Sequence, residues 1–243
     1  MEDKKIPFGS ASPISPYLYM NLYNSYINEI NKAKIKNKGF RRYKLHIFST
    51  EGLNGFLTAN AILEAIIHEQ FSSDLIRNEY KENLLFEIIE KAEKWDIKMK
   101  IEKFPKFLFS KTFNKSQDLY SDIIQIISIR NCITHYQYSL YEGPEKGVKH
   151  LRNKNLTYPK PEKNGSSPWF MELFSTECIR FCINTISLFV EELSKLESPK
   201  YKELNGINKD IFQPLKEDVV KKYFLENNIN PDGIDDPSFD VKL

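Results

Sequence analysis

Apolar residues recur every three or four positions through most of the chain, a spacing that places them on one face of an α-helix. The first run predicts a helix from Pro16 to Asn37, with an apolar face formed by Tyr17, Met20, Tyr23, Ile27 and Ile30. The same spacing predicts further helices over residues 83–96 and 119–135. These runs indicate a mainly α-helical bundle.

The longest helical pattern lies in the C-terminal third of the chain. It starts at Ser167-Pro168, a helix start signal, and ends at Ser198-Pro199. About thirty residues correspond to a helix of roughly 45 Å. Because apolar residues cover more than one stripe of this helix, we expect it at the centre of a bundle or in a dimer interface. A shorter helix is expected around residues 215–225.

Two stretches in the N-terminal half depart from this pattern. Residues 42–48 alternate polar and apolar side chains, which predicts a short strand or an extended connector. Residues 49–56 contain two glycines, which are typical of a turn, although Ser49 followed by Glu51 resembles a helix start. If a helix begins there, Glu51 and Asn54 lie on one face and become candidate contacts for a site. The alternative is that they cap the helix or line a turn.

Composition indicates one globular domain spanning residues 1–243, with an irregular lead-in over 1–15 and an acidic tail over 226–243. A net charge of +2 is too small to argue for nucleic-acid binding by itself. The three cysteines form no metal-binding pattern and fit a reducing compartment. With no signal-peptide pattern and no long apolar run, we expect a soluble cytoplasmic protein that does not cross a membrane.

Basic residues concentrate in two segments. Residues 98–115 hold six lysines and one glutamate, interleaved with four phenylalanines. This pattern suits an RNA backbone with stacked bases, but a solvated lysine edge over a packed aromatic row is favoured. Residues 141–167 are predicted to form a long basic loop. Its side chains are candidate phosphate contacts, namely Lys149, His150, Arg152 and Lys154.

The helix over 119–135 turns polar without leaving its apolar face. One stripe of helical spacing runs Leu119, Ile123, Ile126, Arg130, Ile133, and the adjacent one runs Tyr120, Ile124, Ile127, Asn131, His135. The planar guanidinium of arginine suits phosphate, and histidine exchanges protons near neutral pH. This pairing points to phosphodiester chemistry. The alternative is that Arg130 pairs with a core carboxylate and His135 ends a helix.

The segment Arg130-Asn131-Cys132-Ile133-Thr134-His135 resembles the arginine, polar residue, three variable residues, histidine signature of the HEPN superfamily. The resemblance implies an antiparallel helical bundle, a homodimer that brings two motifs together, and metal-independent ribonuclease activity without a cofactor. It gives Arg130 and His135 the catalytic places and Asn131 the supporting one. In HEPN toxins a tyrosine two residues after the histidine is modified by a partner enzyme. Gln137 stands at that place here, which argues against regulation by that route.

The expected function is therefore RNA cleavage in a toxin or anti-phage defence setting, with RNA as substrate and an antitoxin or defence-system protein as partner. The alternative is a non-catalytic HEPN-like module that binds a nucleotide or a protein. In that case Arg130 binds a phosphate or a carboxylate, and His135 is structural.

Overall fold

The computed structural model describes residues 13–36, 49–76, 94–135, 144–157, 168–197 and 209–216, and it is mainly helical. The α-helices are α1 (Ser15–Lys36), α2 (Glu51–Ile76), α4 (Ile97–Phe109), α5 (Asp118–His135), α6 (Glu145–Asn153) and α7 (Thr176–Leu196). Two short 3-10 helices are η2 (Trp169–Leu173) and η3 (Lys209–Ile211). The described ranges contain no β-strand. None of the helices in them is long and apolar enough to span a lipid bilayer.

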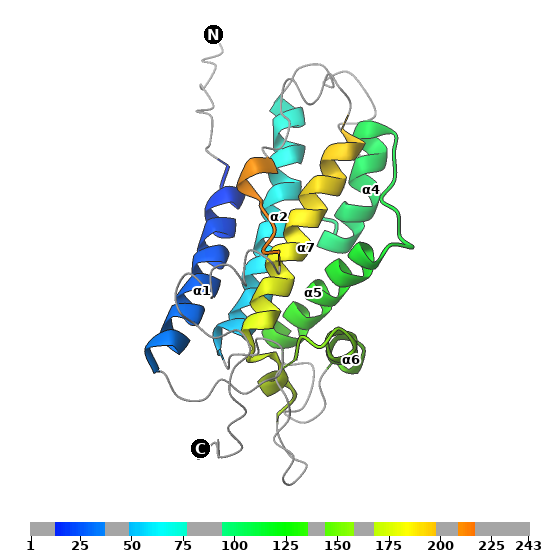
Figure 1. Ribbon diagram of the computed structural model, residues 1–243. Coiled ribbons are helices and arrows are strands. Elements are labelled where there is room, and N and C mark those ends of the chain that lie inside the picture. Colours follow the sequence, from blue (N-terminus) through cyan, green and yellow to red (C-terminus); the bar gives the residue numbers. More distant parts are fainter. Residues whose placement is uncertain are drawn as a thin grey trace, which may run out of the picture.

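Helix α7 lies at the centre of an antiparallel bundle, as its broad apolar surface predicted. It packs against α1, α2, α4 and α5, and α1 and α5 run opposite to α7 and α2 (Figure 1). Helix α6 lies across α5 near the end of the bundle where α5 finishes (Figure 1). The central side chains of α7, Ile183, Ile186, Phe189 and Leu193, are all completely buried. The mainly helical bundle expected from the sequence is therefore confirmed.

The buried face of α1 differs from the predicted one. Tyr17 and Met20 were assigned to the core, but 65% and 45% of these side chains are exposed. The buried residues are Tyr19, Leu22, Tyr26 and Ile30. Both sets follow helical spacing, so periodicity alone did not distinguish them. The choice follows from packing, since Tyr19 contacts the ring of Phe212 at a centroid distance of 4.9 Å and donates a hydrogen bond to the Gln213 carbonyl.

Helix α2 begins at Glu51, so the start signal was correct and the glycines do not form a turn. The Ser49 hydroxyl accepts a hydrogen bond from the Glu51 backbone N–H at 3.1 Å. Gly52 lies in the first turn, where a Cβ atom would come within 2.1 Å of the Leu173 carbonyl oxygen. Gly52 therefore lets α2 approach the backbone that leads into α7.

The predicted thirty-residue helix from Ser167-Pro168 is wrong at its start. The chain first forms η2, then becomes extended at Ser175, and α7 begins only at Thr176. The Ser175 hydroxyl accepts a hydrogen bond from the Glu177 N–H at 3.2 Å and so caps α7. The Ser49 N–H, just before α2, donates a hydrogen bond to the Phe174 carbonyl. The start of α2 therefore contacts the chain at the point where the predicted helix is interrupted.

The predicted basic loop is also corrected, because residues 145–153 form helix α6. Val148 and Leu151 are buried against the core, and a Cβ on Gly147 would lie 3.1 Å from the Ile129 side chain. Three apolar or small positions at helical spacing within a charged segment were enough to form a short helix against α5.

In the segment 98–115, the packed aromatic row and the solvated lysine edge are as predicted, and whether the lysines bind a ligand stays a separate question. Phe104, Phe109 and Phe113 are buried, while Lys103 and Lys106 are exposed. Several other predictions lie outside the described residues, namely the strand over 42–48, most of the helix over 83–96, the N-terminal lead-in up to residue 12 and the acidic tail. Of the predicted helix around 215–225, only Leu215 and Lys216 are described, and they are not helical.

Candidate functional site at the end of helix α5

In the C-terminal half of α5, the buried stripe continues from Ile126 to Ile129 and Cys132 rather than to Arg130. Ile126, Ile129 and Cys132 are buried, and Ile129 is completely inaccessible. Arg130 is only half-buried and lies at the margin of that face. The expectation that Arg130 takes a core position is therefore corrected, because Ile129 takes that position. Because the guanidinium stays partly in contact with water, its burial carries only part of the desolvation free energy of a charged group.

Arg130 and Asn131 form the central contact of the motif. Nη1 of Arg130 donates a hydrogen bond to Oδ1 of Asn131 at 3.0 Å. The backbone carbonyl of Arg130 accepts from the Thr134 hydroxyl at 3.1 Å. Within the described part of the chain, no carboxylate pairs with Arg130. A guanidinium carries five N–H donors, and most of those of Arg130 have no partner in the described part of the chain.

His135 is the last residue of α5, and its side chain is exposed. The helix continues to His135, so the five-residue step from Arg130 turns the side-chain direction by about 140°. A single chain therefore does not place the imidazole beside the guanidinium. Asn131, half-buried, lies between them in the sequence and orients Arg130 rather than His135.

Glu51 and Asn54 lie on one face of α2, as predicted, and bond to each other. Nδ2 of Asn54 donates to Oε2 of Glu51 at 3.1 Å. No hydrogen bond or ion pair joins either residue to Arg130 in the described ranges. Figure 1 shows that the start of α2 and the end of α5 lie at the same end of the bundle. Glu51 and Asn54 thus lie at the same end of the bundle as the motif, but no described hydrogen bond or ion pair connects them to Arg130.

Two basic residues in the segment that was predicted to be a loop form ion pairs with buried carboxylates. Nε and Nη2 of Arg152 donate to Glu172 at 2.6 and 2.7 Å, and only 3% of Glu172 is exposed. Nζ of Lys154 contacts both oxygens of Asp122 at 2.5 and 2.7 Å. Nε2 of His150 lies 2.6 Å from the same carboxylate.

These contacts give His150, Arg152 and Lys154 a structural role that the sequence did not predict. Asp122 belongs to α5 and Glu172 to η2, so the three side chains tie α6 and the turn after it to two other elements. Lys149 differs, because it is exposed and has no partner among the described residues. The signal for Asp122 was present in the sequence, since it precedes Ile126 by four residues on the apolar face of α5.

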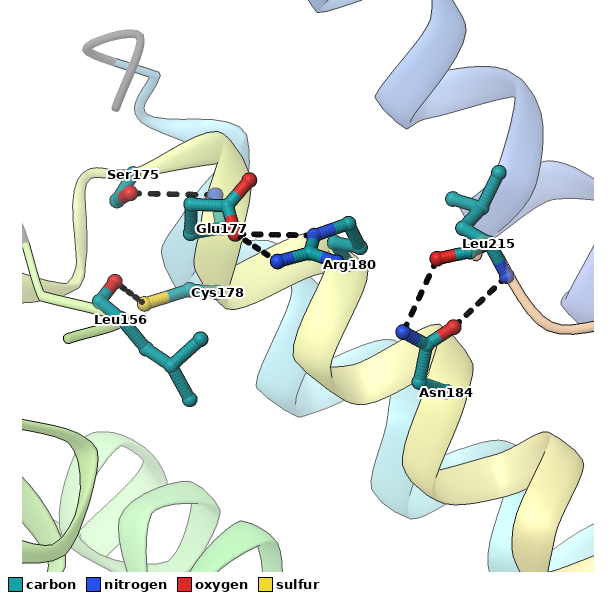
Figure 2. Close-up of polar contacts among 7 residues, drawn as sticks. All are labelled: Leu156, Ser175, Glu177, Cys178, Arg180, Asn184 and Leu215. Carbon is teal, nitrogen blue, oxygen red and sulfur yellow. Dashed lines mark hydrogen bonds and ion pairs between the residues drawn. The ribbon is translucent and has the colours of Figure 1, made fainter. Parts of the chain in front are cut away.

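A second polar cluster surrounds the start of α7 (Figure 2). Nε and Nη2 of Arg180 donate to one oxygen of Glu177, which is 3% exposed. Burial, and to a smaller extent the Glu177 carboxylate, raise the pKa of the Tyr26 hydroxyl. Arg180 and Glu177 face α1, so this cluster belongs to helix packing rather than to an accessible site.

Further along α7, two side chains hold distant segments of backbone. The Cys178 thiol donates to the Leu156 carbonyl at 3.3 Å, and burial raises the pKa of this thiol, as is typical of a structural cysteine. Asn184 both accepts from the Leu215 N–H at 2.7 Å and donates to the Leu215 carbonyl at 3.2 Å (Figure 2). The side chain of Asn184 thus satisfies both backbone groups of one residue.

Comparison of this chain with protein-family models, with curated proteins and with solved structures finds no match.

Replacing Arg152 by glutamine should destabilise the fold, because it leaves the buried Glu172 carboxylate without its fork of donors. We expect a loss of about 1–3 kcal/mol in the free energy of unfolding. Lys149→Gln removes the same charge from the same helix and should leave stability unchanged within about 0.5 kcal/mol. Urea denaturation of both variants measures the difference. Equal stability of the two proteins would show that the Arg152 contact does not hold α6.

Proposed function

We propose that this protein is a metal-independent endoribonuclease of the HEPN type, with Arg130, Asn131 and His135 as its catalytic group. The proposal rests on how the motif side chains are placed at the end of α5. Arg130 is half-buried and oriented by Asn131, with no carboxylate among the described residues to neutralise it. His135 is exposed at the terminus of the same helix. An anion-binding group and a proton-transfer group are thus presented to solvent.

The chemistry needs no group beyond those of the protein and its substrate. RNA carries its own nucleophile, since the 2′-hydroxyl attacks the adjacent phosphorus once its proton is removed. One histidine removes that proton and another protonates the departing 5′-oxygen. The arginine guanidinium stabilises the negative charge that develops on the phosphate oxygens.

A second copy of the chain is required by this scheme. One motif supplies one histidine, and in one chain His135 points about 140° away from Arg130. A symmetric dimer supplies two histidines and allows Arg130 of one protomer to meet His135 of its partner. We therefore expect light scattering to report twice the chain mass of 28.6 kDa. A monomer at micromolar concentration, both with and without RNA, would contradict the scheme.

The direct test is incubation of the purified protein with single-stranded RNA in the presence of EDTA. Cleavage that persists with EDTA and yields 2′,3′-cyclic phosphate ends is the expected result. Mixing wild-type protein with an excess of His135→Ala protein adds a test of geometry, because a site that needs one histidine from each protomer loses activity in the heterodimer. No cleavage of any RNA, in a protein that folds and dimerises, would overturn the proposal.

The second candidate function is a non-catalytic module that binds a nucleotide or a protein. The divergence of Arg130 and His135 on α5 favours it, because a lone oriented guanidinium suffices to hold a phosphate or a carboxylate. In that case Arg130→Ala abolishes ligand binding, whereas His135→Ala leaves it unchanged. A cytoplasmic role in a toxin or anti-phage defence system, with an antitoxin or other partner protein, belongs to the first candidate and rests on the motif's resemblance.

A further inference from the structure

The outward face of helix α4 combines basic and apolar side chains. Met99, Lys103 and Lys106 follow helical spacing and are exposed, with Lys100 half-exposed beside them. The opposite face is buried through Ile97, Ile101 and Phe104. Helix α4 lies at the side of the bundle, and its Phe109 end points away from the end where His135 lies (Figure 1). We call this outward face, including the preceding Trp95, the α4 face.

The positive charge of the α4 face is not compensated within the described part of the chain. The helix carries one acidic residue, Glu102, and this carboxylate turns away from Lys103 and Lys106. It accepts from Lys115 at 2.6 Å and from the Tyr120 hydroxyl. Both hydrogen bonds lower the pKa of Glu102, and the one from Lys115 has the larger effect. Lys100, Lys103 and Lys106 form no ion pair with a described carboxylate, so the face attracts anions.

Apolar surface accompanies this charge. Trp95 is partly exposed, and the Lys103 ammonium lies 4.9 Å from the centroid of its ring. Met99, one helical turn before Lys103, is 36% exposed. Phe104 and Phe109 do not serve such a role, since they are buried. Trp95 is a partly exposed aromatic side chain of the α4 face.

We propose that the α4 face binds single-stranded RNA, with Lys103 and Lys106 contacting phosphates and a base packing on Trp95 and Met99. Cations along a backbone path together with an aromatic platform are the combination that proteins use for single strands. The combination of lysines with a partly exposed indole favours a nucleic-acid strand over an acidic peptide, and the polyglutamate comparison below tests that choice. This inference goes beyond the proposed function, because it concerns binding on a different part of the bundle and holds whether or not Arg130 and His135 cleave RNA.

The first test measures binding without cleavage. A fluorescent 2′-O-methyl single-stranded oligonucleotide lacks the 2′-nucleophile, so anisotropy reports affinity alone. The double variant Lys103→Gln/Lys106→Gln should bind about tenfold more weakly at low salt, and its salt slope should fall by about 1.4, since each phosphate contact contributes about 0.7 for single strands. Lys209→Gln/Lys216→Gln removes two exposed lysines elsewhere and should change affinity less than about twofold.

The second test reports on the indole. The chain has two tryptophans, and Trp169 is buried, so a ligand that reaches Trp95 changes the fluorescence of that residue. Saturation with the oligonucleotide should quench part of the emission, and Trp95→Phe should remove the quenching. Retained folding of each variant is checked by circular dichroism.

Three results would overturn the proposal. The first is equal affinity of wild type and Lys103→Gln/Lys106→Gln, and the second is an equal loss in the Lys209→Gln/Lys216→Gln control. The third is equally tight binding of polyglutamate with the same lysine dependence, which would make the face a general polyanion site. Because the 2′-O-methyl strand cannot be cleaved, this test gives its result whether or not the protein cuts RNA, so a failure of the cleavage proposal remains distinguishable from a failure of this one.

Discussion

His135→Ala should reduce RNA cleavage by about 10²-fold or more, the effect expected of a lost general acid or base, while the melting temperature stays nearly unchanged. The physical reason for the second part is the position of His135. Its side chain is exposed at the last residue of α5, so truncation creates no cavity and leaves no buried group without a partner. Initial cleavage rates in EDTA and thermal denaturation of the same preparation provide the two measurements.

Arg130→Ala is the companion variant. Cleavage should also fall, because the charge that stabilises the phosphate is lost, whereas stability should hold or rise slightly since the guanidinium is half-buried and has no described carboxylate partner. Thr134→Ala serves as a control on the same turn, because its exposed hydroxyl bonds only backbone carbonyls. If Arg130→Ala unfolds the protein while His135→Ala cleaves RNA normally, the arginine is structural and the catalytic interpretation is wrong.

Gly52→Ala should destabilise the whole bundle. A Cβ there would lie 2.1 Å from the Leu173 carbonyl oxygen and 2.7 Å from that of Ser175, and both are backbone atoms that cannot rotate away. Either α2 or the break before α7 must move, which disturbs the packing of the two helices. We expect a loss of at least about 2–3 kcal/mol in the free energy of unfolding, as for other overpacked positions. Urea denaturation followed by circular dichroism measures this loss.

Gly55→Ala is the matched control, one turn along the same helix. Its Cβ would meet Ile179 at 3.5 Å, an ordinary contact distance, and alanine is favoured over glycine in a helix by up to about 1 kcal/mol. This variant should therefore be neutral or slightly stabilised. Equal stability of the two variants would mean that the close approach at Gly52 does not constrain the junction between α2 and α7.

Local sequence signals determined a large part of this protein. Apolar residues at helical spacing established the mainly helical class and the approximate positions of α1, α5 and α7, because an amphipathic helix must bury one face wherever it packs. Ser49 followed by Glu51 indicated a helix start as one of two interpretations, and the structure confirms that one, since the Ser49 hydroxyl accepts from a backbone N–H within its own turn. Spacing and side-chain chemistry also singled out Arg130, Asn131 and His135, and the catalytic role of these residues stays a prediction.

Only the tertiary structure decided which of two possible faces is buried. On α1, the Tyr19 stripe rather than the Tyr17 stripe is buried because Phe212, nearly two hundred residues away, packs on it. On α5, Ile129 rather than Arg130 faces the core, which leaves the guanidinium available at the margin. Stripes that start one residue apart differ by about 100° of rotation, yet both satisfy the three- and four-residue spacing, so periodicity does not choose between them.

The ion pairs of α6 show the same limit for charged residues. In the sequence, Arg152 and Lys154 could not be distinguished from Lys149 as candidate phosphate contacts. The position of a basic residue in a glycine- and proline-rich segment does not show which carboxylate it pairs with. Their partners, Glu172 and Asp122, come from other elements, and only folding brings these carboxylates into the interior beside them. A buried carboxylate requires a partner, and the identity of that partner depends on three-dimensional contact rather than on spacing along the chain.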